Sequence, residues 1–406
     1  MVESLQLTQS SRVITAEVQP TPEELAAVWF SIICEPGDEF GGYIRQSLGV
    51  SEALQMVRAG NSSALVRQLI SVNAQDLGVA RFGDLDKVAG EAFARWTPRL
   101  SPSALTQSHD WLKRSKSWLI TPHSELWPEN LNHLGWAAPA VLWGRGSPEA
   151  LVATNLSLSV VGSRGATNYG SWVTGELITE LRAFDISIVS GGAYGIDAAA
   201  HRAALAAELT TVAVLAGGVD RLYPSGNHEL FDTIIQKGAV VSELPPGASP
   251  TKWRFLQRNR LIAALADATL VVEAGKRSGS ISTANHATEL GRSVGAIPGP
   301  ITATSSQGCN RLIQSAQAEL IQDSDDLLNL LGLHSRLSQL EVEATDQLAP
   351  LEIRLLDALT TRPTDPAKVA QRAGLTMIEA NVAFTQLNLL QLAISKDAGW
   401  ARMSAT

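Results

Sequence analysis

The chain has 406 residues, of which 45% are hydrophobic and 18% are charged, a composition that supports a buried core and two or three domains. With 32 Lys and Arg against 40 Asp and Glu, the formal net charge is −8, which argues against a general electrostatic attraction to nucleic acid. Any anion site must therefore be a local basic patch.

Cysteine usage and the amino terminus favour a reducing cytoplasm. The only cysteines, Cys34 and Cys309, lie far apart and form no CxxC motif, so neither a disulfide framework nor a zinc site is expected. The first residues lack the apolar core of a signal peptide, and no segment approaches the roughly 20 apolar residues of a membrane span. We expect a cytoplasmic protein that does not contact membranes.

Residues 1–110 predict a helical accessory domain. The segments PEELAAVWFSIIC, SEALQMVRAG and NSSALVRQLISV repeat apolar residues at helical spacing and end in turn residues. A SAM-like or helix-hairpin-helix-like arrangement would fit, although the segment offers little basic charge for a DNA contact and no catalytic cluster.

Residues 111–335 predict an α/β domain. Short β-rich runs alternate with helical ones, beginning with LSLSVVGSR and GSWVTGELITELRAF. This alternation is typical of a doubly wound, mostly parallel sheet with helices on both faces. Such sheets bind ligands in Gly-rich loops at the carboxyl ends of their strands.

Four Gly-rich turns follow predicted strands and are candidates for phosphate binding: GSRGATNYG, SGGAYGID, AGGVDRLYPSGN and VVEAGKRSGSIST. Backbone N–H groups at a helix start attract anions, and the planar guanidinium of Arg164 suits phosphate. An Arg164 that only makes a structural ion pair in a tight turn is an equally good interpretation of the first turn. Neither GxGxxG nor GxxxxGK[ST] is present. The candidate residues in these turns are Gly162, Ser163, Arg164, Lys276, Ser278, Gly279, Ser280 and Thr283.

The segment KWRFLQRNR, residues 252–260, holds four basic and two aromatic side chains and no acid. If it is helical, Arg254 and Arg258 share one side, where like charges are unfavourable unless an anion neutralises them. Lys252 beside Phe255 pairs a cation with an aromatic ring, a combination that suits single-stranded nucleic acid. A solvated basic helix face is the alternative.

No catalytic, cofactor or metal site is predicted. The chain shows no paired carboxylates, metal-ligand cluster or Ser/His/Asp spacing that would assign catalysis. His201, His228 and His286 are isolated, as expected of helix-face or capping residues.

The carboxyl-terminal part predicts a linker over residues 336–349 and a winged-helix-like domain over residues 350–406. Two or three helices precede a strand–turn–strand segment around residues 397–399, and Gly374 marks a helix-turn-helix turn. The candidate recognition helix, residues 376–390, contains Glu379 and no Lys or Arg. Major-groove readers normally use Arg, Lys, Asn or Gln. Asn381, Gln386 and Asn388 are present, but no cation is available to contact the DNA backbone, so we expect a protein-contact or dimer-modulating role.

Over residues 117–322, a series of short motifs resembles the DNA-processing protein A family, also called DprA or Smf. The motifs occur in the order GSR…YG, SGGAYGIDAAAH, AGGVDRLYPSGN, SELPPG, FLQRNRLIAALAD, VVEAGKRSGSIST, IPGP and GCNRLI. The resemblance implies an extended Rossmann-like fold that binds single-stranded DNA, often as a homodimer. It also implies delivery of the strand to the RecA recombinase during natural transformation, and no enzymatic activity.

The resemblance also assigns a DNA pocket, carried onto matching positions of this chain. The pocket would contain Gly162, Ser163, Arg164, Lys252, Phe255, Arg258, Arg260 and the turn from Ser278 to Ser280, with Asn259 holding the loop. The chain departs from the family pattern at Leu256, where Pro is frequent, at Ser225, where Lys is common, and at Ser315-Ala316, where Gly-Ala is frequent. These departures imply a somewhat weaker affinity.

A nucleotide-binding hydrolase is the alternative function. The related lysine-decarboxylase-like phosphoribohydrolases carry a PGGxGTxxE signature, whereas this chain has SGSISTANHATE with Glu289 late in the helix. A NAD-dependent oxidoreductase fits less well, because its fingerprint is missing.

Overall fold

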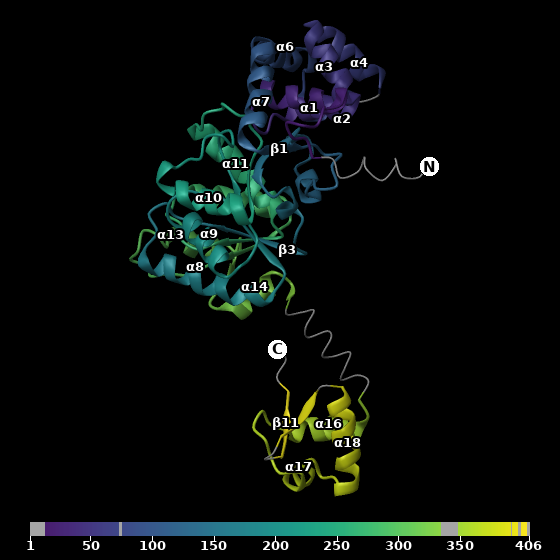
Figure 1. Ribbon diagram of the computed structural model, residues 1–406, viewed down its shortest axis with the longest axis vertical. Helices are drawn as coiled ribbons and strands as arrows, with labels where there is room; N and C mark the ends of the chain where they lie inside the picture. Colours follow the sequence, from purple (N-terminus) through teal and green to yellow (C-terminus); the bar gives the residue numbers. More distant parts are fainter. Residues whose placement is uncertain (1–12, 73–74, 334–347, 391, 397–398, 404–406) are drawn as a thin grey trace. The chain divides into compact units, whose positions relative to one another are not determined.

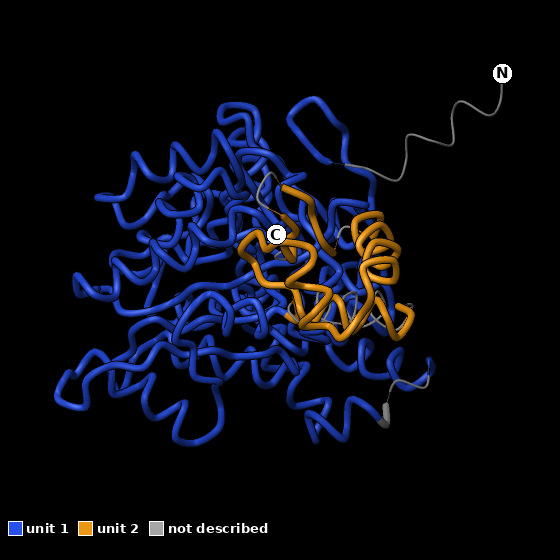
Figure 2. The backbone as a smooth tube through the Cα atoms, turned by 90° about the horizontal axis from the view of Figure 1, so that it is seen from below, with its two compact units in different colours: residues 1–331 blue, residues 332–406 orange. Residues whose placement is uncertain are grey.

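The computed structural model describes residues 13–72, 75–333, 348–390, 392–396 and 399–403. The chain divides into two compact units, residues 1–331 and 332–406, which are shown in different colours in Figure 2. Each unit is described by itself. None of the helices in these ranges is long and apolar enough to cross a membrane.

The amino-terminal part of the first unit is helical, as predicted, and its caps explain where the helices begin. Thr21 and Glu24 form a capping box before the first helix, and Asp38, Asn61 and Asp84 cap later ones through their side chains. The core beneath is rich in aromatic rings. The helices are α1 (Pro22–Ile33), α2 (Glu39–Leu48), α3 (Val50–Ala59), α4 (Ser62–Ser71), α5 (Gln75–Phe82), α6 (Leu85–Trp96) and α7 (Pro102–Ser115).

The rest of this unit is built on a nine-stranded sheet with the order β1-β2-β6-β5-β4-β3-β7-β8-β9. The seven neighbouring strands β6, β5, β4, β3, β7, β8 and β9 are parallel to one another. Beside β6 lies β2, which is antiparallel to it, and β1 is antiparallel to β2. The strands are β1 (Ser117–Ile120), β2 (Leu142–Gly146), β3 (Leu156–Val161), β4 (Ile186–Ser190), β5 (Thr211–Val214), β6 (Ala239–Ser242), β7 (Ala268–Val271), β8 (Ser293–Ala296) and β9 (Glu319–Leu320). The predicted α/β class with a mostly parallel sheet is confirmed.

Helices cover both faces of the sheet, which explains why its inner strands are buried throughout. The helices α8, α9 and α10 pack side by side, and α11 packs against α12 (Figure 1). They are α8 (Asn168–Glu180), α9 (Ile196–Ala206), α10 (His228–Lys237), α11 (Lys252–Leu265), α12 (Gly279–Glu289), α13 (Gln307–Gln314) and α14 (Ser324–Leu330). Short 3-10 turns occur at Thr97–Arg99, Glu129–Ala137, Pro148–Leu151, Leu181–Ala183 and Ser225–Asn227.

Strand β3 is the point at which the direction of winding changes. The chain runs from β3 through β4 and β5 to β6 on one side, and α11 then returns it to β7 on the other side of β3. The loops that leave β3, β4 and β7 therefore diverge at one edge of the sheet. Sheets of this topology bind ligands in the crevice that such divergence opens.

The described residues of the second unit form three helices and an antiparallel strand pair. The elements are α16 (Pro350–Ala358), α17 (Pro366–Ala373), α18 (Met377–Leu389), β10 (Ala393–Lys396) and β11 (Gly399–Arg402). Gly374 ends α17 in the left-handed conformation, with φ of 63°, which suits the predicted turn. Residues 397–398 of the predicted wing and most of the predicted linker lie outside the described residues. The winged-helix assignment stays a prediction.

Burial of His201 leads to a prediction about stability. The imidazole lies fully buried beneath the sheet, where Nδ1 is 2.8 Å from Thr211 Oγ1 and Nε2 has no partner among the described residues. Burial, together with the positive charges of Arg258 and Arg202, lowers the pKa of His201 from 6.5 to about 3. Between pH 6.5 and pH 3, His201 binds a proton in the unfolded chain but stays neutral in the folded protein. The free energy of unfolding therefore falls as the pH is lowered through this range.

We therefore expect the free energy of unfolding to lose up to about 1.4 kcal/mol per pH unit through this residue in that window. His201→Asn keeps a polar atom near Thr211 and does not titrate, so its unfolding free energy should fall less steeply with acid. Urea unfolding of both proteins over a pH series checks this. Parallel curves for the two proteins would show that His201 is not the source.

Candidate nucleic-acid interface

A cavity of about 200 Å³ opens at the edge of the sheet where the loops after β3, β4 and β7 diverge. One face of α11 and the first turn of α12 complete its wall. Of the residues singled out in the sequence, nine line it: Gly162, Arg164, Phe255, Arg258, Asn259, Ser278, Gly279, Ser280 and Thr283. Val161, Ala193, Asp197, Leu256 and Ile262 line it as well.

Helix α11 brings its cationic and aromatic residues to the cavity through helical spacing. Thr251 caps the helix by accepting a hydrogen bond from the Arg254 N–H, at 3.3 Å. Phe255, Arg258 and Asn259 are three and four residues apart, so they share the face that lines the cavity. The remainder of the helix is buried in the core from residue 258 onward, which fixes this orientation.

Phe255 lies close to two guanidinium groups. The Cζ atom of Arg164 is 4.9 Å from the centre of the ring, and that of Arg258 is 5.9 Å from it. Arg164 is exposed whereas Arg258 is buried, so one cation stands at the mouth of the cavity and the other in its wall. Cation–π contact holds the exposed Arg164 side chain where an incoming phosphate would meet it.

Arg258 is a fixed charge. Its Nη1 donates to the Val214 carbonyl at 2.6 Å, and its Nε has no partner among the described residues. Burial lowers the pKa of Arg258 to about 10, an effect that Asp197 opposes, so the group remains charged at neutral pH. A side chain at Gly191 would place its Cβ 2.0 Å from Arg258 Nη1, which explains why the turn after β4 begins with glycine.

Asp197 organises the turns around the cavity, and sequence reasoning missed it. Burial raises the pKa of this carboxyl, while Arg258 and the backbone N–H groups of Ala193, Gly162 and Gly191 lower it. One buried carboxylate therefore holds both the turn after β3 and the turn after β4. The only signal in the sequence was an acid in the first turn of a predicted helix, a position that also suits simple dipole stabilisation.

The turn Ser278–Ser280 presents the start of α12 to the cavity. Ser278 caps the helix by accepting a hydrogen bond from Ser280 N–H at 3.3 Å, and the two hydroxyls are 2.7 Å apart. Asn259 Nδ2 donates to the Gly279 carbonyl at 3.1 Å, which is the holding contact expected of it. Backbone N–H groups and hydroxyls at a helix start can form a cradle for phosphate.

Three predicted residues lie at the rim rather than in the wall. Lys252 is exposed, three residues before Phe255, and so extends the cavity-lining face of α11 by one turn. Lys276 is exposed in the loop that leads to Ser278. The Ser163 hydroxyl accepts a hydrogen bond from the Gly165 N–H at 3.2 Å and thereby shapes its own turn.

Two expectations about the cationic segment are corrected. Arg260 is 4% exposed and forms an ion pair with Glu243, and it does not line the cavity. Arg254 makes a two-pronged ion pair with Glu35, at 2.9 and 2.8 Å, and so does not form an anion site with Arg258. Glu243 and Glu35 are 17 and 219 residues away from these partners in sequence, so the local absence of acids was misleading.

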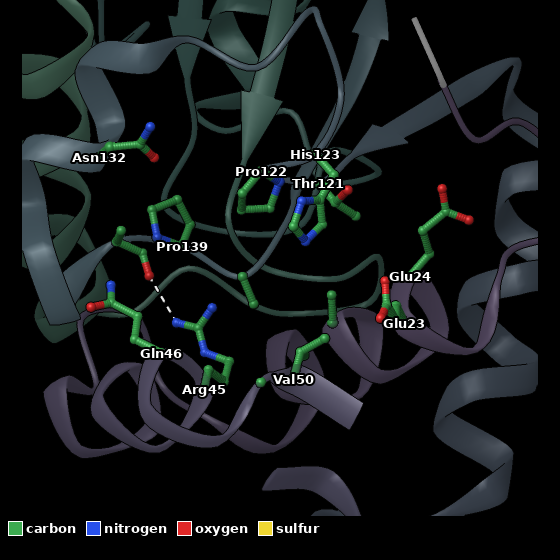
Figure 3. A pocket seen from close by; sticks show the side chains of 14 residues that line it. Glu23, Glu24, Arg45, Gln46, Val50, Thr121, Pro122, His123, Asn132 and Pro139 are labelled. Carbon is green, nitrogen blue, oxygen red and sulfur yellow. Dashed lines mark hydrogen bonds between the residues drawn. The ribbon is translucent and has the colours of Figure 1, made fainter. Parts of the chain in front are cut away.

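A second cavity, of about 290 Å³, lies between the amino-terminal helices and the segments that flank β1 and β2 (Figure 3). Its one arginine, Arg45, already donates to the Ala138 carbonyl at 2.9 Å. Glu23 and Glu24 stand at its edge. Carboxylates there would repel phosphate, so this cavity fits a polynucleotide less well than the strand-end cavity does.

Comparison with known proteins places these features in context. Residues 118–332 match the family described as DNA recombination-mediator protein A. A protein from Mycobacterium tuberculosis, provisionally named DNA processing protein DprA, is 36% identical, and the alignment covers 95% of each chain. Protein Smf from Escherichia coli is 35% identical over 72% of this chain and 79% of its own. The X-ray structure of DNA processing protein A from Streptococcus pneumoniae is similar with a TM-score of 0.59 and 29% identity, over 77% of this chain and 98% of that one.

Proposed function

Because this chain belongs to the DNA recombination-mediator protein A family, we propose that it binds single-stranded DNA in the strand-end cavity. The observation that carries the proposal is the convergence of Arg164, Arg258, Phe255 and the helix start at Ser278 on one cavity. Cations and backbone N–H groups there suit phosphates, and aromatic rings suit bases. Such rings can meet a base only where it is unpaired, which favours a single strand over a duplex.

We propose that the protein acts by binding rather than by catalysis. Asp197 is the one carboxylate among the described residues that line the cavity, and Arg258 and three backbone N–H groups engage it. A carboxylate committed in this way is poorly placed to serve as a general base for nucleotide hydrolysis. This supports a mediator that holds DNA over the hydrolase alternative.

We further propose that the bound strand passes to a RecA recombinase, that the protein works in the cytoplasm during natural transformation, and that two copies act together. The second unit supports a role in protein contact. On α18 the side chains of Ile378, Val382 and Leu389 are 79%, 68% and 71% exposed, and this apolar helix carries no Lys or Arg. Such a surface suits another protein better than the major groove of DNA.

The central proposal predicts a preference for single strands and a definite salt dependence. Fluorescence anisotropy with labelled oligo-dT and a duplex of equal length should show tighter binding of the single strand. The logarithm of its affinity should fall against the logarithm of salt concentration with a slope of about −0.7 for each phosphate neutralised. No free base should be released from AMP under the same conditions. Stronger binding of the duplex would contradict the proposed site, and robust base release would favour the hydrolase.

A further inference from the structure

The aromatic ring that sequence reasoning assigned to base stacking is already surrounded. Phe255 is half-buried, with Arg164 and Arg258 beside it and the Tyr223 ring centroid 5.7 Å away at an interplanar angle of 56°. A base can reach this ring only by displacing or sharing these contacts. The accessible aromatic surface lies next to it, on Tyr223 and Tyr194, whose side chains are 50% and 48% exposed.

Both tyrosines stand at the edge of the cavity. Tyr223 contacts Phe255, which lines the cavity, and Tyr194 directly follows Ala193, which also lines it. The two rings come from different loops, one after β5 and one after β4. We name this pair, Tyr194 and Tyr223, the aromatic rim.

Hydrogen bonds join the two loops that carry the aromatic rim, and these bonds help to fix the positions of the rings. The Tyr194 hydroxyl accepts a hydrogen bond from the Gly226 N–H at 3.2 Å. Asn227 Nδ2 donates to the carbonyls of Gly192 and Ala193, at 3.0 and 3.2 Å. A Cβ atom at Gly226 would lie 2.5 Å from the Tyr194 hydroxyl, so glycine is needed for this approach. Rings held in place lose little conformational entropy when a ligand stacks on them.

From these observations we infer that the DNA path continues out of the cavity over the aromatic rim, where Tyr223 and Tyr194 stack unpaired bases. The inference rests on the proposed function and adds a base-binding surface to it. Arg164, exposed beside Phe255, would hold the phosphate of the nucleotide that enters the cavity. Stacking tolerates every base, so the rim would lengthen the bound segment without selecting a sequence.

The test compares oligo-dT with an abasic oligonucleotide of the same length, which keeps the phosphates and lacks the bases. Tyr223→Ala should weaken the binding of oligo-dT about tenfold, the effect of losing one stacked base, and leave the abasic probe and the salt slope unchanged. Tyr223→Phe retains the ring and should bind oligo-dT like the unaltered protein. Tyr194→Leu should behave like Tyr223→Ala.

Trp172→Ala is the matched control, because Trp172 is a 60% exposed ring on α8 that lies after the GSRGATNYG turn and outside the lining of the cavity. It should bind both probes normally. Equal loss of affinity for both probes in Tyr223→Ala would mean that the ring only supports Arg164 and Phe255, and unchanged oligo-dT affinity would mean that no base stacks there. Either result overturns the inference while leaving single-strand binding intact. Failure of the unaltered protein to bind oligo-dT would overturn the proposed function itself.

Discussion

Arg164→Ala is expected to lower the affinity for oligo-dT by roughly ten- to a hundredfold. A charge-assisted hydrogen bond contributes about 1.5–3 kcal/mol, and Arg164 is positioned to make such bonds. Its guanidinium is exposed at the mouth of the cavity, stacks 4.9 Å from the centre of the Phe255 ring, and forms no ion pair within the described part of the chain. A phosphate would therefore not have to compete with a carboxylate of the protein.

The salt dependence distinguishes a phosphate contact from a structural role. If Arg164 neutralises one phosphate, the slope should become less steep by about 0.7 in the alanine variant. Arg164→Lys keeps the charge but loses the planar guanidinium, which binds phosphate in a bidentate manner and stacks on Phe255. Its salt slope should therefore be close to that of the unaltered protein, while its affinity stays lower.

Arg182→Ala is the matched control for the loss of one positive charge. Arg182 is exposed in the turn between α8 and β4, at the opposite edge of the sheet from the cavity. Its removal should leave affinity and slope nearly unchanged. Equal effects in the two alanine variants would point to a general electrostatic attraction, and an unaffected Arg164→Ala would remove Arg164 from the site.

Several residues singled out in the sequence line the cavity, and their positions follow from the topology of the sheet. Gly162 and Arg164 lie in the turn after β3, and Ser278 ends the loop that leads from β7 to α12; parallel strands end at one edge of the sheet. The shared face of Phe255 and Arg258 follows from helical spacing, because the segment that connects β6 to β7 is the helix α11. Period and order were therefore sufficient for the α/β fold, whereas the set of pocket residues was implied by the family resemblance.

What sequence reasoning missed depends on partners that are distant in the chain. Glu35 lies just after α1 and pairs with Arg254 of α11, because the amino-terminal helices pack near this part of the α/β domain. No local sequence pattern indicates this contact. The role of Tyr223 is similar, because its loop follows β5 and meets Phe255 only in the folded protein. A count of charges within residues 252–260 could not reveal that two of the four cations, Arg254 and Arg260, pair with carboxylates outside this segment.

The local charge explains how an acidic chain can bind an anion. The pairing of Arg254 and Arg260 with carboxylates removes two cations from the segment, and Asp197 partly offsets Arg258. Arg164, Lys252 and Lys276 remain exposed around the mouth. The surface proposed to attract DNA is thus small, so affinity should depend strongly on contact with the cavity and little on the net charge of −8.

Glu243→Ala is expected to cause the largest loss of stability of any single change considered, about 3–5 kcal/mol. Glu243 follows β6 directly, and its ion pair with Arg260 fastens the middle of α11 to that edge of the sheet. Arg260 is 4% exposed, and its Nε and Nη1 already lack partners within the described residues. Removing the carboxylate would leave a buried charge without compensation, a large cost against the 5–15 kcal/mol that typically stabilises a domain. Urea unfolding measures the loss.

A double variant separates the structural role of Arg260 from the DNA contact first expected of it. Replacing both partners with apolar residues, as Glu243→Leu with Arg260→Met, removes both charges of the pair, so most of the lost stability should return. This folded variant should bind oligo-dT with the salt slope of the unaltered protein, because Arg260 does not line the cavity. A slope less steep by about 0.7 would show that Arg260 leaves Glu243 to meet a phosphate when DNA binds. In that case Arg260 would exchange Glu243 for a phosphate on binding, and the position of α11 would depend on the bound strand.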